Sequence, residues 1–417
     1  MLAVASHSAA MTAQYDIIIV GGGLNGCTLA LALAGAGFKI SVIDKLDSET
    51  MSRDFDGRSY AMARASCNLL DAIGLWDSLS SDAQPILEIK VSDGRAGEGP
   101  SAFWMHFDHA ELEDGPMGHM IEDRFLRPTL LSALGEAPNI DHFAPETVVE
   151  QSLRDHGVLV TLASGATQSA RLLIGCDGRK SGTADRGRIT RSFKDYGQTA
   201  LVAAIGHQKP HNGIAHQFFM PAGPLAILPL RGNRSSIVWA ESHARAAELN
   251  AMDDAAFLGA LAPAFGDFLG PISLAGTRFS YPLNQTIAAD LVGPRLALVG
   301  DAAHGIHPIA GQGLNQGLRD AASLAEVLAD AARRGEDIAA ADVLGRYATW
   351  RRADSKLAAL ATDKFNRLFS NDNQALRFGR DLGMGLVSAL PPLRRAFMRE
   401  AAGLTGDLPR LLRGQSL

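Results

Sequence analysis

Residues 15–45 read YDIIIVGGGLNGCTLALALAGAGFKISVIDK, which predicts a βαβ unit. An apolar, β-branched run at 17–20 ends in glycine and indicates a buried strand, and the small and apolar residues at 24–36 indicate a helix. A second apolar run at 40–43 completes the unit. Strands that alternate with helices in this way favour an α/β fold with a parallel sheet.

Gly21, Gly23 and Gly26 form the pattern GxGxxG between the first strand and the helix. The first glycine permits the tight turn, the second lets the backbone approach a pyrophosphate, and the third lets helix and strand pack closely. The helix N-terminus presents N–H groups and the positive end of its dipole to the phosphates. Asp44 ends the second strand, where an acid binds ribose hydroxyls. We therefore expect a bound dinucleotide; the alternative is a glycine-rich turn without a ligand.

A second glycine-rich stretch, residues 300–320, reads GDAAHGIHPIAGQGLNQGLRD. The apolar run at 296–299 before it predicts a buried strand that ends at Asp301. A carboxylate at a strand end can accept hydrogen bonds from a sugar or ribityl hydroxyl. The alternative is a Gly/Pro loop that caps an ordinary helix.

Four further residues of this stretch are suited to binding the flat ring system of a cofactor. Pro308 stiffens the loop, and Gly311 and Gly313 let the main chain approach the ring. The helix expected from Leu314 directs its N-terminal amides to the same place, where they can stabilise negative charge. A cofactor held at both glycine-rich stretches is long and carries hydroxyl groups in its middle, which fits FAD better than NAD.

The composition narrows the functional classes. The 417 residues suggest two or three domains, or one large fold with a second domain embedded in it. The net charge of −6 argues against nucleic acid as a main partner. The three cysteines lie far apart without a CxxC pair, so we expect neither structural disulfides nor a metal site, and a reducing compartment fits. Glycines interrupt every long apolar run, so no membrane-spanning helix is expected.

The pattern changes further along the chain. Short apolar runs split by Gly, Pro and Asn at 199–241 predict an antiparallel sheet. Between the two glycine-rich stretches we also expect helices at 56–75 and 125–134, and strands at 86–91, 102–107, 157–162 and 170–174.

The expected fold class is therefore α/β, with a Rossmann-like FAD-binding domain, an embedded and mainly antiparallel substrate domain, and a helical C-terminal region. The expected segments are a loose N-terminal extension (1–14), the FAD-binding domain (15–80, 110–185 and 285–355), the substrate domain (81–109 and 186–284) and the helical region (356–417).

Asp177 and Gly178 end another apolar run, in LLIGCDGRKSG. Ligands of doubly wound sheets bind beyond the carboxyl ends of the strands, so this loop is well placed to contact the cofactor. An Asp-Gly pair is also a common turn, and that interpretation stays open.

The three glycine-rich stretches together resemble the flavoprotein aromatic hydroxylases of the para-hydroxybenzoate hydroxylase type. Within that group, HPIAGQGLNQGLRD (307–320) is similar to the ubiquinone-biosynthesis hydroxylases. RSYAMARAS (58–66), GPLAILPL (223–230) and the closing LPRLLRG also resemble that subfamily. The resemblance covers nearly the whole chain, and its most specific part is the motif at 307–320.

The resemblance implies roles for matching residues at the nucleotide end of the site. Asp301 would bind the ribityl chain of FAD. The residues that would hold the ADP half are Gly21, Gly23, Gly26 and Asp44.

Further roles are implied at the flavin end. Gly313, Leu314 and Asn315 would lie by the pyrimidine end of the flavin. Arg58 and Arg124 match positions that contact the flavin or its phosphates, with a surface or salt-bridging arginine as the alternative for each.

The Asp-Gly loop departs from the family pattern DGxxSxxR. Ser181 fits, but Ala184 stands where the family has arginine, and Arg186 or Arg188 is a candidate to compensate. Because the family motif is linked to both FAD and pyridine nucleotide, the departure puts reductant binding in question.

A reaction is also implied. NAD(P)H would bind transiently and reduce FAD, O2 would add to form a C4a-hydroperoxide, and a phenol ring would attack its outer oxygen. No second GxGxxG follows a strand, so a separate Rossmann domain for NAD(P)H is not expected. The implied substrate is a membrane-soluble prenylated phenol of ubiquinone biosynthesis, and the implied partners are an assembly of quinone-biosynthesis proteins.

A base near the phenol would favour the more reactive phenolate. His307 is the first candidate because of its place in the loop, and His216 and His304 are the others, with a structural role as the alternative for each. AHQFFM (215–220) and LAILPL (225–230) offer an apolar lining for the substrate, with sheet core as the alternative.

The C-terminal stretch at 390–414 reads LPPLRRAFMREAAGLTGDLPRLLRG and mixes apolar residues with arginines. That composition is typical of a segment lying at a membrane surface. The alternative is a solvated helix packed on its own domain or on a partner. We therefore expect a cytoplasmic protein, peripheral on the inner membrane if the first interpretation holds.

Three other functions stay open. One is a catabolic hydroxylase of a small soluble phenol, with tight coupling of NAD(P)H oxidation to a water-soluble ring. A second is a related flavoprotein such as an epoxidase or a prenyl reductase. A third is a non-catalytic flavin-binding scaffold, which would bind FAD without NAD(P)H oxidation under any phenol.

Overall fold

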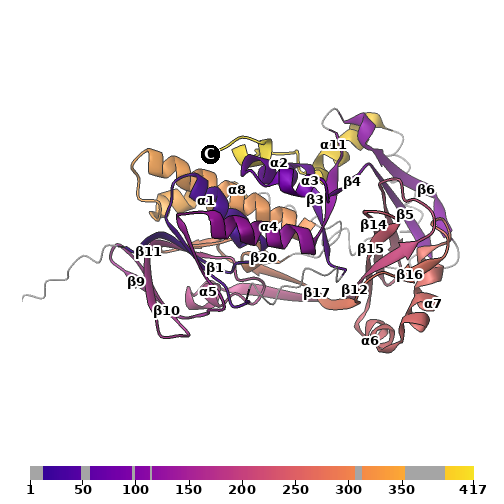
Figure 1. The fold of residues 1–417 in the computed structure, drawn as a ribbon, viewed down its shortest axis with the longest axis horizontal. Coiled ribbons are helices and arrows are strands. Elements are labelled where there is room, and N and C mark those ends of the chain that lie inside the picture. The colour runs from indigo at the N-terminus through magenta and orange to yellow at the C-terminus, as the bar shows by residue number, and fades with distance from the viewer. Residues whose placement is uncertain (1–12, 48–56, 96–98, 113–114, 306–311, 353–389) are drawn as a thin grey trace, which may run out of the picture.

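Two lobes connected by long strands make up the molecule (Figure 1). One lobe is built on an eight-stranded sheet and the other on a nine-stranded sheet, and the chain also forms a three-stranded sheet. The structure is a computed structural model that describes residues 13–47, 57–95, 99–112, 115–305, 312–352 and 390–417.

The βαβ unit predicted from the opening stretch is confirmed. β1 (Tyr15–Val20) and β2 (Ile40–Ile43) are parallel neighbours, and α1 (Leu24–Gly35) connects them. β11 (Thr167–Gly175) pairs in parallel with the other edge of β1. β1 is thus an internal strand with buried side chains on both faces, which explains why its sequence is a continuous apolar run rather than an alternation.

Segments far apart in the chain complete this sheet. β8 (Ile140–Phe143) pairs in parallel with β2, and β19 (Leu296–Leu298) pairs in parallel with β11. β10 (Gly157–Leu162) and β9 (Val148–Arg154) extend the sheet from β11 in antiparallel pairs, and β18 (Val292–Gly293) lies beyond β19. The carboxyl ends of the parallel strands meet at one edge, where ligands of such sheets bind.

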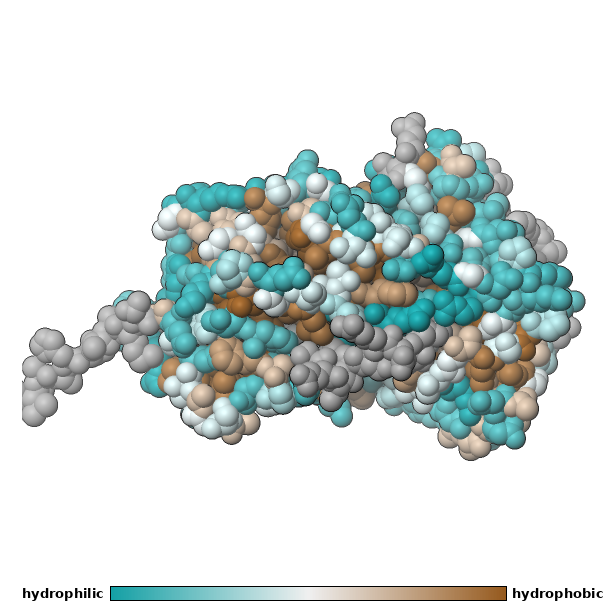
Figure 2. All heavy atoms as spheres, in the orientation of Figure 1, coloured by the Kyte–Doolittle hydropathy of each residue, from teal (hydrophilic) through white to brown (hydrophobic). Residues whose placement is uncertain are grey.

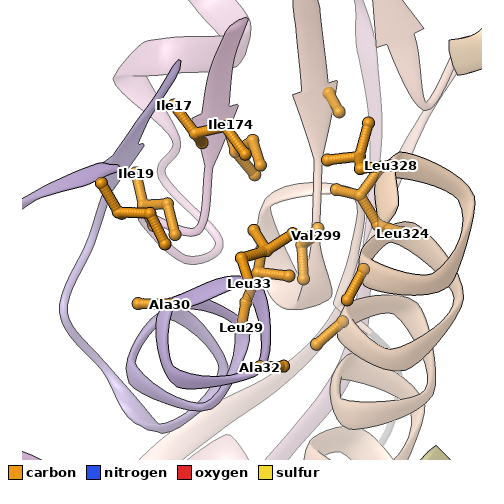
Figure 3. Close-up of a cluster of buried hydrophobic side chains, with 14 of the residues drawn as sticks. Ile17, Ile19, Leu29, Ala30, Ala32, Leu33, Ile174, Val299, Leu324 and Leu328 are labelled. Carbon is orange, nitrogen blue, oxygen red and sulfur yellow. The ribbon is translucent and has the colours of Figure 1, made fainter. Parts of the chain in front are cut away.

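The core of this lobe lies between the sheet and two helices, α1 and α8 (Gln312–Arg333). Figure 3 shows side chains of the strands, of α1 and of α8 converging around Val299. Full burial of one such side chain contributes about 1.5–3 kcal/mol. The largest side chains of the group are Ile17, Ile19, Ile174, Leu29, Leu33, Leu324 and Leu328.

The second lobe confirms the antiparallel sheet predicted from residues 199–241. Among its described pairings, the one between β5 and β13 is parallel and the others are antiparallel. α6 (His243–Ala251) and α7 (Asp254–Phe265) cover one face. The strands are β5 (Glu88–Arg95), β6 (Gly99–Asp108), β12 (Arg191–His207), β13 (Ile214–Met220), β14 (Gly223–Leu230), β15 (Arg234–Ser242), β16 (Ile272–Leu274), β17 (Phe279–Ala288) and β20 (His304–Gly305).

The helix predicted for residues 56–75 is wrong at its start. Residues Ser59–Ala63 form β3, and α2 begins after it (Arg64–Ala72). β3 pairs with β7 (Gly118–Glu122), which also pairs with β4 (Gln84–Ile86). The partner strand is distant in the sequence, so local periodicity carries no sign of the pairing.

The domain limits drawn from the sequence stay a prediction, and two strands do not follow them. β4 falls in the segment assigned to the substrate domain, yet it pairs with β7 of the other segment. β17 runs across the limit at residue 285 as one strand.

Other helices of the described chain are α3 (Trp76–Ser80), α4 (Asp123–Glu136), α5 (Gly182–Arg186) and α11 (Pro391–Ala401).

The predicted C-terminal helical region is described from residue 390, with α11 and a short 3-10 helix at Arg410–Arg413. Most of the predicted N-terminal extension lies outside the described residues. Among the helices that the structure describes, none is both long and apolar enough to cross a membrane.

Candidate cofactor site

The three glycines of GxGxxG occupy three different environments after β1. Gly21 has a φ of +105°, and a Cβ there would overlap the backbone of Cys176 on β11's C-terminal side. A Cβ at Gly26 would overlap the carbonyl oxygen of Gly21. A Cβ at Gly23 would have nothing within 4 Å. The first and third glycines are therefore required by the fold, whereas the second leaves open space at the start of α1.

Asp44 lies at the end of β2 beside the same loop. A Cβ at Gly22 would lie 2.7 Å from Asp44 Oδ2, so the missing side chain makes room for the carboxylate. Asp44 Oδ1 accepts a hydrogen bond from the Leu46 N–H at 3.1 Å. The predicted acid is thus held next to the open start of α1.

Asp301 lies in a one-turn 3-10 helix, Gly300–Ala302, directly after β19. Its carboxylate accepts a hydrogen bond from Arg179 Nε at 3.0 Å. Arg179 Nη1 also donates to the carbonyl and the side-chain oxygen of Asn284 on β17, each at 3.0 Å. Arg179 therefore connects the Asp301 turn to the second lobe. Sequence reasoning missed this residue, although it directly follows the Asp-Gly pair.

The Asp177 carboxylate is engaged by its own loop. It accepts hydrogen bonds from the Thr183 N–H at 2.9 Å, from the Thr183 hydroxyl at 2.8 Å and from the Ser181 hydroxyl. These contacts shape the turn before α5 and so hold Arg179 in place. The turn interpretation therefore accounts for Asp177 without a ligand.

Ala184, which stands where the pattern DGxxSxxR has arginine, is packed in the core of the first lobe. Ala184 is fully buried, so its small side chain belongs to the core. Arg186 points to Gln151, donating from Nε to Oε1 at 3.3 Å, and Arg188 adopts a positive φ of 56°. Among the described residues it is Arg179, and not Arg186, whose guanidinium is hydrogen-bonded to Asp301.

Asn315 fixes the start of α8. Its Oδ1 accepts from the Ala63 N–H at 2.9 Å and the Ser66 hydroxyl at 2.7 Å, and its Nδ2 donates to the Ala61 carbonyl at 2.8 Å. The side chain thus ties the first turn of α8 to β3 and α2 and positions the N-terminal amides of that helix. A Cβ at neighbouring Gly313 would have nothing within 4 Å, so the predicted open backbone is present there.

Asn25, which sequence reasoning did not single out, lies where α1 meets α8. A Cβ at Gly300 or at Gly317 would overlap its side-chain amide. Its Oδ1 is buried, and no hydrogen-bond partner for it exists among the described residues. An open acceptor between the GxGxxG loop and the Asp301 turn fits a ligand that carries hydroxyl groups.

Arg58 and Arg124 lie beside two buried acids at the start of α4. Arg58 Nη2 is 3.5 Å from Asp123 Oδ2, and Arg124 Nε donates to Glu122 Oε2 at 2.7 Å. The Arg58 guanidinium also lies 5.8 Å from the ring centroid of Phe279 on β17. Their ion pairs match the salt-bridging alternative, and a contact with the cofactor stays a prediction.

The candidate bases lie in three different places, and His304 is buried in β20. His307, together with Pro308 and Gly311, lies outside the described residues. His216 is the cross-strand partner of Ile227, whose side chain packs under α7. The centroid of the His216 ring is 4.5 Å from the centroid of the Phe268 ring. Burial, with a smaller effect of the Lys90 charge, lowers the pKa of His216 to about 4.

The apolar runs proposed as a substrate lining are split between the two faces of the sheet. Leu225 and Ile227 pack against the helix-covered side, so they are sheet core rather than lining. Ala215 and Leu230 face the other way and pack with Met120 of β7, toward the first lobe. On the side of the molecule that Figure 2 shows, hydrophobic atoms form patches over the first lobe and low on the second, surrounded by hydrophilic surface.

Together these features fit FAD. Open space lies over Gly23 at a helix N-terminus without a side-chain cap, and the Asp44 carboxylate lies beside the same loop. The donors and acceptors at Asn25 and Asp301 suit a polyhydroxylated chain. The N-terminus of α8 supplies amides at the far end.

Comparison with known proteins identifies the chain. A family model described as FAD binding domain matches residues 14–360. Ubiquinone hydroxylase UbiL of Rhodospirillum rubrum is 46% identical over 406 residues, covering 96% of this chain and 93% of that protein. The chain belongs to the FAD-dependent monooxygenases. The resemblance inferred from the motifs is thereby confirmed.

A further relative and a solved structure extend the comparison. The 3-demethoxyubiquinol 3-hydroxylase of Escherichia coli K12 is 35% identical, covering 93% of this chain and 98% of that protein. The crystal structure of p-nitrophenol 4-monooxygenase PnpA from Pseudomonas putida DLL-E4 superposes with a TM-score of 0.78 at 22% identity, covering 94% of this chain and 98% of that chain. The latter shows that the monooxygenase shares its fold.

Proposed function

We propose that this monooxygenase hydroxylates the aromatic ring of a polyprenylated phenol in ubiquinone biosynthesis, with NAD(P)H and O2 as co-substrates. The observation that carries the proposal is the 46% identity over 96% of the chain to a ubiquinone hydroxylase. An identity of this size along the whole length includes both lobes, hence the substrate side as well as the cofactor side.

The chain's own residues supply binding and orientation. The open backbone at Gly23 and the N-terminus of α1 would hold the diphosphate, and Asp44 the adenosine ribose. Asp301, oriented by Arg179, and the open acceptor of Asn25 would hold the ribityl chain. When bound, FAD supplies the redox chemistry: it accepts hydride from NAD(P)H and activates O2.

The second lobe would place the substrate ring against the flavin. Met120 and Leu230 are buried core on the side of the second lobe that faces the first, and that side would favour a ring with an apolar tail and exclude water from the reacting atoms. A phenol held there would react with less loss of the activated oxygen to water. The residue that takes the phenol proton stays unassigned among the described residues.

The test is a quinone profile by mass spectrometry in cells with and without this gene. Deletion is expected to remove ubiquinone and to accumulate a prenylphenol lacking one or more ring hydroxyls, and the wild-type gene should reverse both changes. If ubiquinone is unchanged in a strain without a second hydroxylase of this family, the proposed substrate is wrong. Stimulation of NAD(P)H oxidation by a soluble phenol would then point to a catabolic hydroxylase.

We also propose that α11 contacts the membrane in which such a substrate resides. Leu393 and Phe397 of α11 are exposed by 38% and 40%, and Leu390, directly before the helix, by 45%. Arg395 is exposed nearby, while Arg394 turns to Glu111 at 2.9 Å. Apolar residues beside an exposed arginine suit an anionic lipid surface.

Flotation with vesicles of phosphatidylglycerol and phosphatidylethanolamine checks this contact. Replacing both exposed apolar side chains of α11 (L393S/F397S) is expected to weaken vesicle binding about thirtyfold, since each side chain contributes on the order of 1 kcal/mol when buried in lipid. The control is V149S/L153S, which removes two apolar side chains from β9 that are more exposed, at 54% and 57%. Equal loss in both variants, or no binding by the wild type, would contradict the proposal.

A further inference from the structure

Three charged side chains are buried together behind the Asp301 turn. Asp320 of α8 and Arg351, in a helix at 341–352, are both fully buried, and His304 of β20 is 4% exposed. Asp320 Oδ2 lies 2.6 Å from His304 Nε2, and Asp320 Oδ1 accepts a hydrogen bond from Arg351 Nε at 2.7 Å. Neither the cofactor contacts nor the substrate face described above uses this network.

One carboxylate of the network reaches the backbone of the cofactor turn. Asp320 Oδ2 accepts a hydrogen bond from the Gly300 N–H at 2.9 Å, one residue before Asp301. Arg351 Nη2 donates to Gln316 Oε1 at 2.9 Å, which joins the network to the second turn of α8. Asp320 therefore links the Asp301 turn, the start of α8 and the 341–352 helix.

The network holds one carboxylate between two basic side chains. Burial alone would raise the pKa of Asp320, but the charges of His304 and Arg351 outweigh it, so this pKa is lowered. Burial alone would lower the pKa of His304, but the Asp320 charge and hydrogen bond outweigh it, so this pKa is raised. The protonated form of His304 is therefore favoured beside Asp320, in a medium where charges act strongly.

We propose that Asp320 is a positioning residue for the redox half of FAD, which fixes the Asp301 turn through the Gly300 N–H and holds the basic side chains of His304 and Arg351 behind that half. The inference rests on the proposed placement of the ribityl chain at Asp301. Reduced flavin carries negative charge, so a positive charge behind the Asp301 turn favours reduction. The ADP half, bound at the GxGxxG loop, does not depend on Asp320.

The first test compares Asp320→Asn with Asp330→Asn, using FAD and ADP as separate probes. Asp330 is the matched control because it is also an α8 carboxylate paired with an arginine, with Arg410 Nη2 at 2.6 Å, but it makes no contact with the Asp301 turn among those described. Asp320→Asn is expected to raise the Kd for FAD about tenfold and to leave the Kd for ADP unchanged. Asp330→Asn should change neither.

The ADP measurement separates positioning from folding. Equal weakening of FAD and ADP in Asp320→Asn would mean that Asp320 only stabilises the lobe, and the proposal would be overturned. Unchanged binding of both would overturn it as well. A wild-type protein that binds ADP but not FAD would refute the proposed placement of the cofactor itself, which is a different failure.

A second variant, His304→Gln, tests the charge and keeps the Asp320–Gly300 bond. It removes one positive charge, so the reduction potential of the bound flavin at pH 7 should fall below that of the wild type, measured by equilibration with a reference dye. Asp330→Asn should leave the potential unchanged. A potential that does not fall in His304→Gln would overturn the electrostatic role of the network.

Discussion

Replacing Gly26 by alanine is expected to leave the purified protein without FAD. The added Cβ would overlap the carbonyl oxygen of Gly21, which is backbone and cannot rotate away. Relief requires α1 to move off the loop, and the diphosphate would then lose both the helix N-terminus and the open space over Gly23. The bound flavin, read as the absorbance ratio of flavin to protein, should fall at least about tenfold relative to the wild type.

Gly35→Ala is the matched control, because Gly35 ends the same helix and a Cβ there would have nothing within 4 Å. Alanine at a helical position gains on the order of 0.5 kcal/mol over glycine, so this variant should keep its flavin and unfold no earlier than the wild type. Retention of full flavin by Gly26→Ala would mean that the close contact between loop and helix is dispensable. The cofactor site would then have to be placed elsewhere.

Arg351→Met is expected to lower the free energy of unfolding by about 3 kcal/mol, because it removes one partner from a fully buried ion pair. The methionine fills a similar volume. It leaves the buried negative charge of Asp320 without the positive charge of Arg351, and it leaves Gln316 Oε1 without its guanidinium donor. The midpoint of the first urea unfolding transition, followed by far-UV circular dichroism, gives the change.

The neighbouring residue provides the control. Arg352 is paired with Asp290 at 3.3 Å, but both side chains are more than half exposed, at 52% and 63%. Exposed pairs contribute about 0–1 kcal/mol, so Arg352→Met should shift the midpoint only slightly. Similar shifts in the two variants would show that the buried position of Arg351 brings no special dependence on its charge.

The fold was predictable where the pattern is local. The first βαβ unit shows itself in residues 15–45 because its strands are continuous apolar runs next to glycines. β3 was missed because its pairing with β7 joins residues about sixty positions apart, and a five-residue strand directly before a helix looks like the start of that helix.

The residues of the candidate site were likewise predictable only where a local sequence pattern marks them. The glycines and Asp44 were predictable because a known turn geometry requires them. Asn25, Arg179 and Asp320 were not, because each acts across elements that meet only in the folded chain. Asn315 makes hydrogen bonds with β3 and α2, and its predicted place beside the cofactor stays a prediction.

The order of strands in the first sheet also sets the timing of assembly during synthesis. β1 can pair with β11 only after β11 has been synthesised, and β11 can pair with β19 only after residues Leu296–Leu298 have been synthesised. The Asp301 turn gains its buried anchor only when Arg351 has left the ribosome. A nascent chain therefore exposes apolar strands of the first lobe while the whole second lobe is being made, and such long-range pairing is slow and prone to aggregation. Cells that overproduce this protein should depend on chaperones that shield those strands until the C-terminal third arrives.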